Sequence, residues 1–105
     1  MKRGELWWAN QPRPQGRRPV VLLSRDEAYA VRDLIVVTPV TTRVRGLTTE
    51  VRLGTEEGLP RSSVANLDVI TTIRKAYLEE RIGVLSEAKM QAVEAALHFA
   101  LALET

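Results

Sequence analysis

Short apolar runs, separated by polar and turn-forming stretches, dominate the first two-thirds of the chain. Runs occur at residues 6–9, 19–24 and 34–42, and the third is rich in valine and isoleucine, which is typical of β-strands. Residues 19–24 are apolar without alternation, which predicts a strand buried on both faces. Residues 49–53 alternate between polar and apolar and predict a half-exposed strand. Pro39, near the end of the third run, predicts a sheet edge or a bulge.

The pattern changes toward the C-terminus. Residues 62–73 predict two short strands that meet near Asp68, and residues 82–85 predict a short extended segment. Ser86 is then a suitable N-cap for a helix. Apolar residues follow at spacings of three and four, which predicts that one helix face packs on the core; these residues are Met90, Val93, Leu97 and Leu101. The polar stretches predict loops, with one helical turn inside the second of them; they are residues 10–17, 25–33 and 54–60.

Five or more short strands followed by a single helix, without strand–helix alternation, predict a mainly β fold with a C-terminal helix. The expected architecture is a small, strongly curved antiparallel sheet or barrel. With 105 residues, the chain is the size of one domain, and we expect a single domain over residues 1–105.

Composition excludes many catalytic classes. The chain has no cysteine and one histidine, His98, so it offers neither a thiolate nucleophile nor a histidine cluster for a metal, and we expect no metal or cofactor. The longest nearly apolar run, residues 95–103, is too short to cross a bilayer, and the N-terminus does not resemble a signal peptide. We therefore expect a cytoplasmic protein that does not enter membranes.

Charge is distributed unevenly along the chain. Residues 1–45 contain nine basic and four acidic side chains, whereas residues 46–105 contain six basic and nine acidic ones. Arginine dominates the basic part, and a guanidinium can bind a phosphate through two parallel hydrogen bonds. The excess indicates either a solvated arginine-rich surface or a face that binds a polyanion.

Arginines, hydroxyls and isolated acids remain as possible catalytic groups, and this set suits phosphate chemistry without a metal. RNA can be cleaved by attack of a ribose 2′-hydroxyl on its own 3′-phosphate, so the substrate supplies the nucleophile. The protein then has to align the sugar and phosphate and stabilise charge at phosphorus. DNA lacks the 2′-hydroxyl and would not react in this way.

Several segments, in order along nearly the whole chain, resemble the MazF/PemK/Kid family of bacterial toxins, the endoribonucleases of type II toxin–antitoxin pairs. The first is Arg-Gly-Glu-Leu-Trp-Trp, and the second is Gly-Arg-Arg-Pro followed by an apolar strand and serine. A valine-rich strand then ends in Pro-Val-Thr-Thr, a later strand contains Asp-Val-Ile-Thr-Thr-Ile, and Ile-Gly-Val-Leu-Ser precedes the helix. These segments are residues 3–8, 16–24, 36–42, 64–73 and 82–86.

This resemblance implies an SH3-like barrel that forms a homodimer, cuts single-stranded RNA at short sequence motifs without a metal, and is blocked by a cognate antitoxin. The catalytic arginine of the family falls on Arg18 and the catalytic threonine on Thr41. Pro19 biases Arg18 toward an extended backbone, which fixes its base at the start of a strand. A guanidinium stays protonated and cannot easily act as a general base, so we expect Arg18 to stabilise charge at phosphorus and to protonate the leaving group. The remaining candidate RNA-binding residues are Arg17, Thr42, Asn66, Asp68 and Trp8.

Trp7 and Trp8 have to face opposite sides of a regular strand, and the sequence leaves open which of them is in the core. The first loop lacks the glutamate and histidine of other members, and Asn66 stands where some members have an arginine, so the general base and the preferred RNA motif also stay open. Two other functions remain: a non-catalytic SH3-like module that binds RNA or protein, and a CcdB-type gyrase poison. The latter family acts through an aromatic C-terminal tail, which residues 102–105 do not have.

Overall fold

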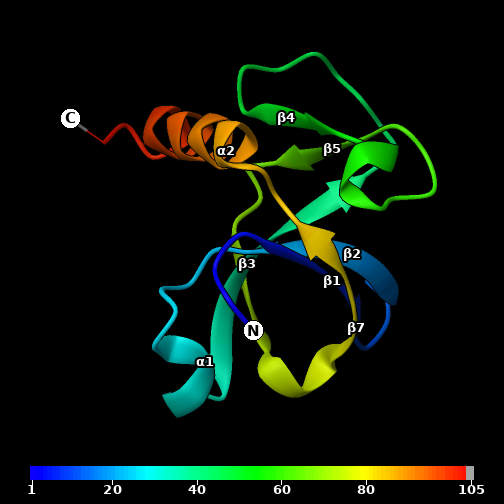
Figure 1. Ribbon diagram of the computed structural model, residues 1–105, viewed down its shortest axis with the longest axis vertical. Helices are drawn as coiled ribbons and strands as arrows, with labels where there is room; N and C mark the ends of the chain where they lie inside the picture. Colours follow the sequence, from blue (N-terminus) through cyan, green and yellow to red (C-terminus); the bar gives the residue numbers. More distant parts are fainter. Residues whose placement is uncertain (104–105) are drawn as a thin grey trace.

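The computed structural model describes residues 1–103 and is a curled antiparallel sheet with one long helix, as the sequence predicts (Figure 1). Its strands are β1 (Glu5–Asn10), β2 (Arg17–Leu22), β3 (Leu34–Thr41), β4 (Glu50–Leu53), β5 (Ser63–Asn66), β6 (Thr71–Arg74) and β7 (Leu78–Val84). The α-helices are α1 (Ala28–Val31) and α2 (Glu87–Ala100), and two short 3₁₀ turns are η1 (Thr55–Glu57) and η2 (Lys75–Tyr77).

The central strand is β3, which connects the two halves of the sheet. The strand order is β4-β5-β3-β2-β1-β7, and β6 also pairs with β3. Residues 34–37 of β3 pair with β6, and residues 40–41 pair with β5. Pro39 lies between these two sets and opposite Val20 of β2, so β3 is a central strand, but Pro39 is locally at an edge because its side away from β2 is unpaired. A proline is tolerated at this point because neither β6 nor β5 pairs with it.

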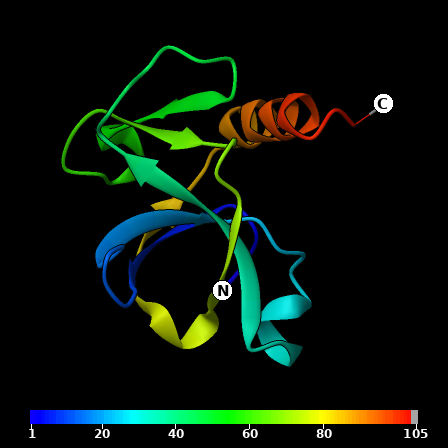
Figure 2. The same ribbon diagram turned by 180° about the vertical axis from the view of Figure 1, so that it is seen from behind.

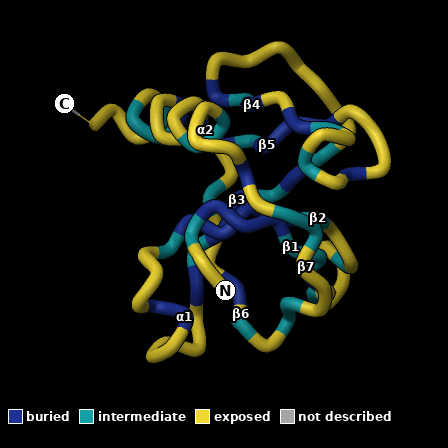
Figure 3. Tube along the Cα trace, in the orientation of Figure 1, coloured by how far each residue is buried: buried dark blue, intermediate teal, exposed yellow. Residues whose placement is uncertain are grey.

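Apolar side chains from the two faces of the sheet form two separate cores. The first contains Leu6, Val21, Val40 and Ala65 and extends under α2, whereas the second contains Ala9, Val20, Leu22, Ile35 and Val37. Neighbouring residues of β2 therefore serve different cores, which confirms that this strand is buried on both faces. Figure 3 shows the buried trace concentrated in β1, β2 and β3, where the two cores meet.

Helix α2 lies against β4 and β5, as Figure 2 shows from behind. The Ser86 side chain accepts a hydrogen bond from the Lys89 backbone N–H and caps the helix as predicted. Val93 and Ala96 are buried, and Met90 and Leu97 pack against the first core. We expect Leu101 in this stripe, but it is 53% exposed, because the C-terminal end of α2 extends beyond β4 and β5 (Figure 1).

Strand β7 is longer than the sequence predicts, since only its end falls within the expected segment at residues 82–85. Its first half is Leu-Glu-Glu-Arg, and three of these four side chains are exposed. The strand pairs only with β1 and forms the edge of the sheet. Charged side chains are common on such edges because they discourage pairing with other chains. In β7 they leave too few apolar residues for the sequence to predict a strand there.

Glu5 is 9% exposed and anchors the start of β1 through three hydrogen bonds. One carboxylate oxygen accepts from Trp7 Nε1 and the Lys2 backbone N–H, and the other accepts from Arg81 Nε at 3.1 Å. Desolvation by itself raises the pKa of this carboxyl, but the hydrogen bonds from Trp7, Lys2 and Arg81 outweigh it and lower the pKa. The folded protein therefore favours the ionised form.

Replacement of Glu5 should lower stability in a pH-dependent manner. We expect Glu5→Ala to reduce the free energy of unfolding at pH 7 by about 1–2 kcal/mol, because Trp7 and Arg81 lose a charged acceptor. The difference in unfolding free energy between the two proteins should be largest at pH values above the ordinary carboxyl pKa. It should shrink as the pH falls through the lowered pKa that Glu5 has in the folded protein. Urea unfolding from pH 7 to pH 3 measures it, with the exposed Glu27→Ala as control. A difference that stays constant down to pH 3 would contradict this role of the carboxylate.

Candidate functional site

One cleft of about 360 Å³ collects four of the seven candidate residues. It is formed by β1, the start of β2, the end of β3 and the segment that precedes β5. The four are Trp8, Arg18, Thr41 and Thr42, and the other lining residues are Pro19, Val40, Leu59, Pro60, Arg61 and Ser63. Both charged groups in this lining are cationic, so the cleft is suited to a negatively charged ligand.

Arg18 of β2 and Thr41 of β3 both line the cleft. Val20 of β2 pairs with Pro39 of β3 at the end of the ladder between these strands, and Arg18 and Thr41 each lie two residues beyond this pair. Arg18 itself is paired with Ala9 of β1, which fixes its backbone from the other side. Its side chain is exposed, and none of the ion pairs within residues 1–103 involves it. The guanidinium is therefore free to bind an anion in the cleft.

Thr41 is the last residue of β3, and its hydroxyl is oriented by the turn that follows. Thr41 Oγ1 accepts a hydrogen bond of 3.1 Å from the Arg43 backbone N–H. Since the oxygen is used as an acceptor, the hydroxyl hydrogen can be donated to an anion. Thr42 follows the end of the strand, where alternation no longer applies, and it lines the same cleft as Thr41.

The two tryptophans have separate roles, which the sequence left open. Trp7 packs against the second core, and Trp8 lines the cleft. The Arg17 guanidinium lies 4.5 Å from the centre of the Trp8 ring and forms ion pairs with Glu79 and Glu80 at 3.2 and 3.3 Å. Arg17 is therefore held beside the cleft by β7 and does not line it.

Asn66 and Asp68 lie away from the cleft. Ser63 begins β5 at the cleft, and Asn66 ends that strand, which places the two about 10 Å apart at the rise of an extended chain. The Asn66 side chain accepts from the Asp68 backbone N–H, and Asp68 accepts from Thr49 Oγ1 at 2.6 Å. These residues therefore form a polar turn at the other end of β5.

Sequence reasoning missed the wall of the cleft that lies opposite β2. Leu59 is buried, whereas Pro60 and Arg61 are exposed and line the cleft. The Ser63 hydroxyl donates to the Arg61 carbonyl at 3.0 Å and fixes the segment where it enters β5. Leu-Pro-Arg in a stretch of polar residues predicts only a loop, because its position beside Arg18 depends on contacts distant in sequence.

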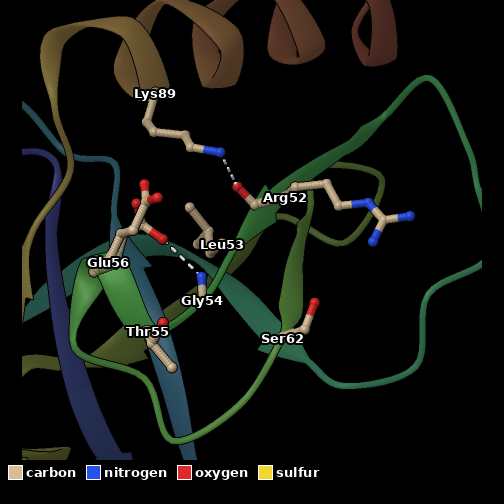
Figure 4. A pocket seen from close by; sticks show the side chains of 8 residues that line it. Arg52, Leu53, Gly54, Thr55, Glu56, Ser62 and Lys89 are labelled. Atoms are coloured by element: carbon tan, nitrogen blue, oxygen red, sulfur yellow. Dashed lines mark hydrogen bonds between the residues drawn. The ribbon is translucent and has the colours of Figure 1, made fainter.

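A second hollow of about 410 Å³ lies between β4, η1 and the start of α2 (Figure 4). Lys89 Nζ donates to the Arg52 carbonyl, and the Gly54 backbone N–H donates to Glu57 Oε1 at 2.6 Å. The carboxylates of Glu56 and Glu57 line this hollow, and the Lys89 amine is already hydrogen bonded. The hollow therefore suits an anion less well than the cleft around Arg18 does. Within residues 1–103, no group of three or more His, Cys, Asp and Glu side chains is placed to hold a metal ion.

The loop beyond Thr42 is organised by Glu50. Its carboxylate accepts backbone N–H groups of Arg45, Gly46 and Leu47 at 2.8–3.2 Å. Desolvation tends to raise the pKa of Glu50, but these hydrogen bonds and the charge of Arg45 outweigh it, so the pKa is lowered. The ionised carboxylate thus orders the loop that begins at the cleft.

Protonation or removal of the Glu50 carboxylate should loosen this loop. We expect faster amide hydrogen exchange at residues 45–47 in Glu50→Ala than in the unmodified protein at pH 7. Because the folded pKa is lowered, the protection should persist at pH 5 and disappear as the pH falls through the folded value. Exchange measured by NMR gives the result, with the β3 amides as internal reference. Equal protection of residues 45–47 in both proteins at pH 7 would contradict the assignment.

No helix in the described part of the chain is long and apolar enough to cross a membrane. The fold and the site together define a class: small proteins whose β-sheet is curled into a half-barrel, with a cationic cleft at the ends of neighbouring strands. Residues 2–101 match the model of the family described as PemK-like, MazF-like toxin of type II toxin–antitoxin system. The chain belongs to this family.

Known relatives are similar in both sequence and structure. The chain is 42% identical over 100 residues to the probable endoribonuclease MazF5 of Mycobacterium tuberculosis, which covers 94% of this chain and 91% of that protein. The solved structure of the Mycobacterium tuberculosis toxin MazF-mt6 superposes with a TM-score of 0.89 at 32% identity, covering 96% of this chain and 99% of that one. A mycobacterial endoribonuclease in complex with its cognate antitoxin gives a TM-score of 0.87 at 27% identity, covering 100% of this chain and 98% of that one. The fold predicted from the sequence is thereby confirmed.

Proposed function

We propose that this chain is an endoribonuclease toxin that cleaves single-stranded RNA at short sequence motifs without a metal. The observation that supports this most is the shared cleft of Arg18 and Thr41, whose described lining is cationic and lacks carboxylates. Relatives that are named endoribonucleases match almost the whole chain. A cleft of this charge attracts the phosphates of a nucleic acid, and its arginine and threonine supply donors for one of them.

In the proposed reaction the ribose 2′-oxygen attacks the adjacent phosphorus. A bond forms between the 2′-oxygen and phosphorus, and the bond between phosphorus and the 5′-oxygen of the next nucleotide breaks. The 2′-hydroxyl loses its proton and the leaving 5′-oxygen gains one, so the products are a 2′,3′-cyclic phosphate and a 5′-hydroxyl. Arg18 donates two N–H groups to the phosphoryl oxygens and stabilises the charge that develops on them. Thr41 donates its hydroxyl to a phosphoryl oxygen and holds the phosphate in line.

Proton transfer has few protein candidates in this cleft. None of its ten described lining residues has a carboxylate or an imidazole side chain. His98 is on α2 and lines another hollow, together with Arg3 and Glu94. We therefore propose that water accepts the 2′-hydroxyl proton. The Arg18 guanidinium donates the proton that the leaving 5′-oxygen gains and regains one from solvent, and the other tasks of the protein are positioning and charge stabilisation.

Other residues would bind RNA around the scissile phosphate. Trp8 presents an aromatic ring on which a base can stack, and Arg17 extends the cationic surface beside it. Thr42 offers a further hydroxyl in the cleft. Asn66 and Asp68 lie at the other end of β5 and would contact nucleotides further along the RNA.

We propose further that residues 1–105 form one toxin domain, that it forms a homodimer in the cytoplasm, and that a cognate antitoxin blocks its RNA-binding surface. Large apolar side chains are exposed around the end of α2 and are available for contacts with another chain; they are Phe99, Leu101 and Leu103. The antitoxin complex of a structural relative supports such a partner. A cytoplasmic location follows from the proposed substrate, which is found there.

Incubation of the purified protein with a long RNA in EDTA tests the proposal. We expect discrete fragments whose upstream ends are 2′,3′-cyclic phosphates and whose downstream ends are 5′-hydroxyls, and mapping of these ends gives the sequence motif. RNA that stays intact but is retarded on a gel would favour a non-catalytic binding module. Cleavage that requires added metal would contradict the proposed chemistry.

A further inference from the structure

The wall of the cleft opposite β2 contains a second arginine with no partner assigned to it. Arg61 lines the same cleft of about 360 Å³ as Arg18, but it comes from the segment between η1 and β5. Its side chain is exposed, and it forms no ion pair within residues 1–103. Two like charges in one small cleft repel each other, so their arrangement favours a ligand that neutralises both.

The backbone of Arg61 is held firmly on both sides. Leu59, two residues earlier, is 3% exposed and belongs to the first core. Ser63, two residues later, is buried and donates its hydroxyl to the Arg61 carbonyl. A long, flexible side chain on a fixed base is suited to positioning a ligand, because little backbone order has to be gained on binding.

We propose that Arg61 binds the phosphate next to the scissile phosphate and thereby sets the register of the RNA on Arg18 and Thr41. This inference rests on the proposed ribonuclease function. A single RNA strand carries one phosphate per nucleotide, so a strand that places one phosphate at Arg18 brings a neighbouring phosphate to the opposite wall. Arg61 is a positioning residue in this arrangement, since it does not touch the reacting atoms.

The contact to a neighbouring phosphate is the same in the ground state and in the transition state. Its loss should therefore raise KM and leave kcat nearly unchanged, unlike the loss of a group that acts on the developing charge. We expect Arg61→Ala to raise KM about tenfold, in keeping with one charged hydrogen-bonding contact at a partly exposed site. The dependence of log KM on log salt should also become shallower by about 0.7, the contribution of one phosphate contact on a single strand.

Steady-state cleavage of a short RNA that contains the mapped motif tests these expectations in the intact protein, with salt varied. Arg61→Lys should restore part of the affinity and the salt dependence, since it keeps the charge. Arg52→Ala, which removes a charge at the other hollow, is the matched control and should leave both parameters unchanged. A fluorescence titration with the same strand carrying a 2′-deoxy group at the cleaved position reports binding without cleavage.

Unchanged KM and salt dependence in Arg61→Ala, with normal cleavage by the unmodified protein, would overturn the inference about Arg61 and leave the ribonuclease function standing. A changed sequence motif with an unchanged salt dependence would also overturn it, because Arg61 would then read a base. If the unmodified protein binds the deoxy-substituted strand but cleaves no RNA, the ribonuclease function is wrong and the inference falls with it.

Discussion

Arg18→Ala is expected to lower kcat for RNA cleavage by about 10²- to 10³-fold, as for the loss of one preorganised donor to a developing oxyanion. Arg18 is fixed by its pairing with Ala9, is exposed in the cleft and has no ion-pair partner in the described structure. Its contribution should be greatest in the transition state, where charge on the phosphoryl oxygens is highest. KM should therefore change much less than kcat.

The Arg18 experiment needs a charge-matched control and a folding control. Arg32→Ala removes the same charge at the end of α1, remote from the cleft in sequence and fold, and should leave kcat unchanged. Arg18→Lys keeps the charge but loses the planar pair of donors, so we expect its kcat to lie between those of Arg18→Ala and the unmodified protein. Thermal melting confirms that the variants are folded. An Arg18→Ala protein that is folded and cleaves RNA at the unmodified rate would rule out the assigned role.

Gly83→Ala is expected to be the most destabilising of the substitutions considered. A Cβ atom at Gly83 of β7 would lie 2.6 Å from the Glu57 carbonyl oxygen of η1, a backbone atom that cannot move without displacing the turn. We expect a loss of about 3 kcal/mol in the free energy of unfolding and a fall in melting temperature of roughly 15 °C. The same turn leads directly into Leu59 and Arg61, so the strain should also reach the wall of the cleft.

Gly54→Ala is the matched control for the Gly83 experiment, since its nearest contact would be the Ser62 Cα atom at 3.8 Å, an ordinary van der Waals distance. We expect a much smaller loss for this variant, and differential scanning calorimetry compares the two. Equal melting temperatures for Gly83→Ala and the unmodified protein would show that β7 and η1 can separate at little cost.

The sequence predicts those parts of the fold whose side chains are buried in a regular pattern. Residues 19–24 and 34–42 are apolar because both faces of β2 and β3 are covered, and these strands form close to where the pattern places them. The first half of β7 has no such pattern, because it is an edge strand whose charged side chains face solvent. Leu101 continues the apolar spacing of α2, but this end of the helix extends beyond the sheet, so the side chain has no core to pack on.

In the candidate site, too, residues within a local motif could be predicted, whereas contacts between segments distant in sequence could not. Arg18 and Thr41 could be selected from the motifs around them, and the fold brings both of them to one cleft. Trp8 is among the candidates, but strand pairing cannot be read from composition, so the sequence does not decide which of Trp7 and Trp8 is in the core, and it does not predict the place of Arg61 in the cleft. Asn66 and Asp68 could be selected from a recognisable motif, but they lie outside the cleft because the length of β5 separates them from it.

The most direct test compares two oligonucleotides of the mapped motif that differ in one atom: one has ribose at the cleaved position, and the other has 2′-deoxyribose there. Both are incubated with the unmodified protein in EDTA, and the products are identified by mass spectrometry. Attack by the 2′-oxygen predicts that the ribose strand is cut to a 2′,3′-cyclic phosphate and that the deoxy strand stays intact although it binds. Cleavage of the deoxy strand at the same position would contradict this mechanism, because its nucleophile would be absent.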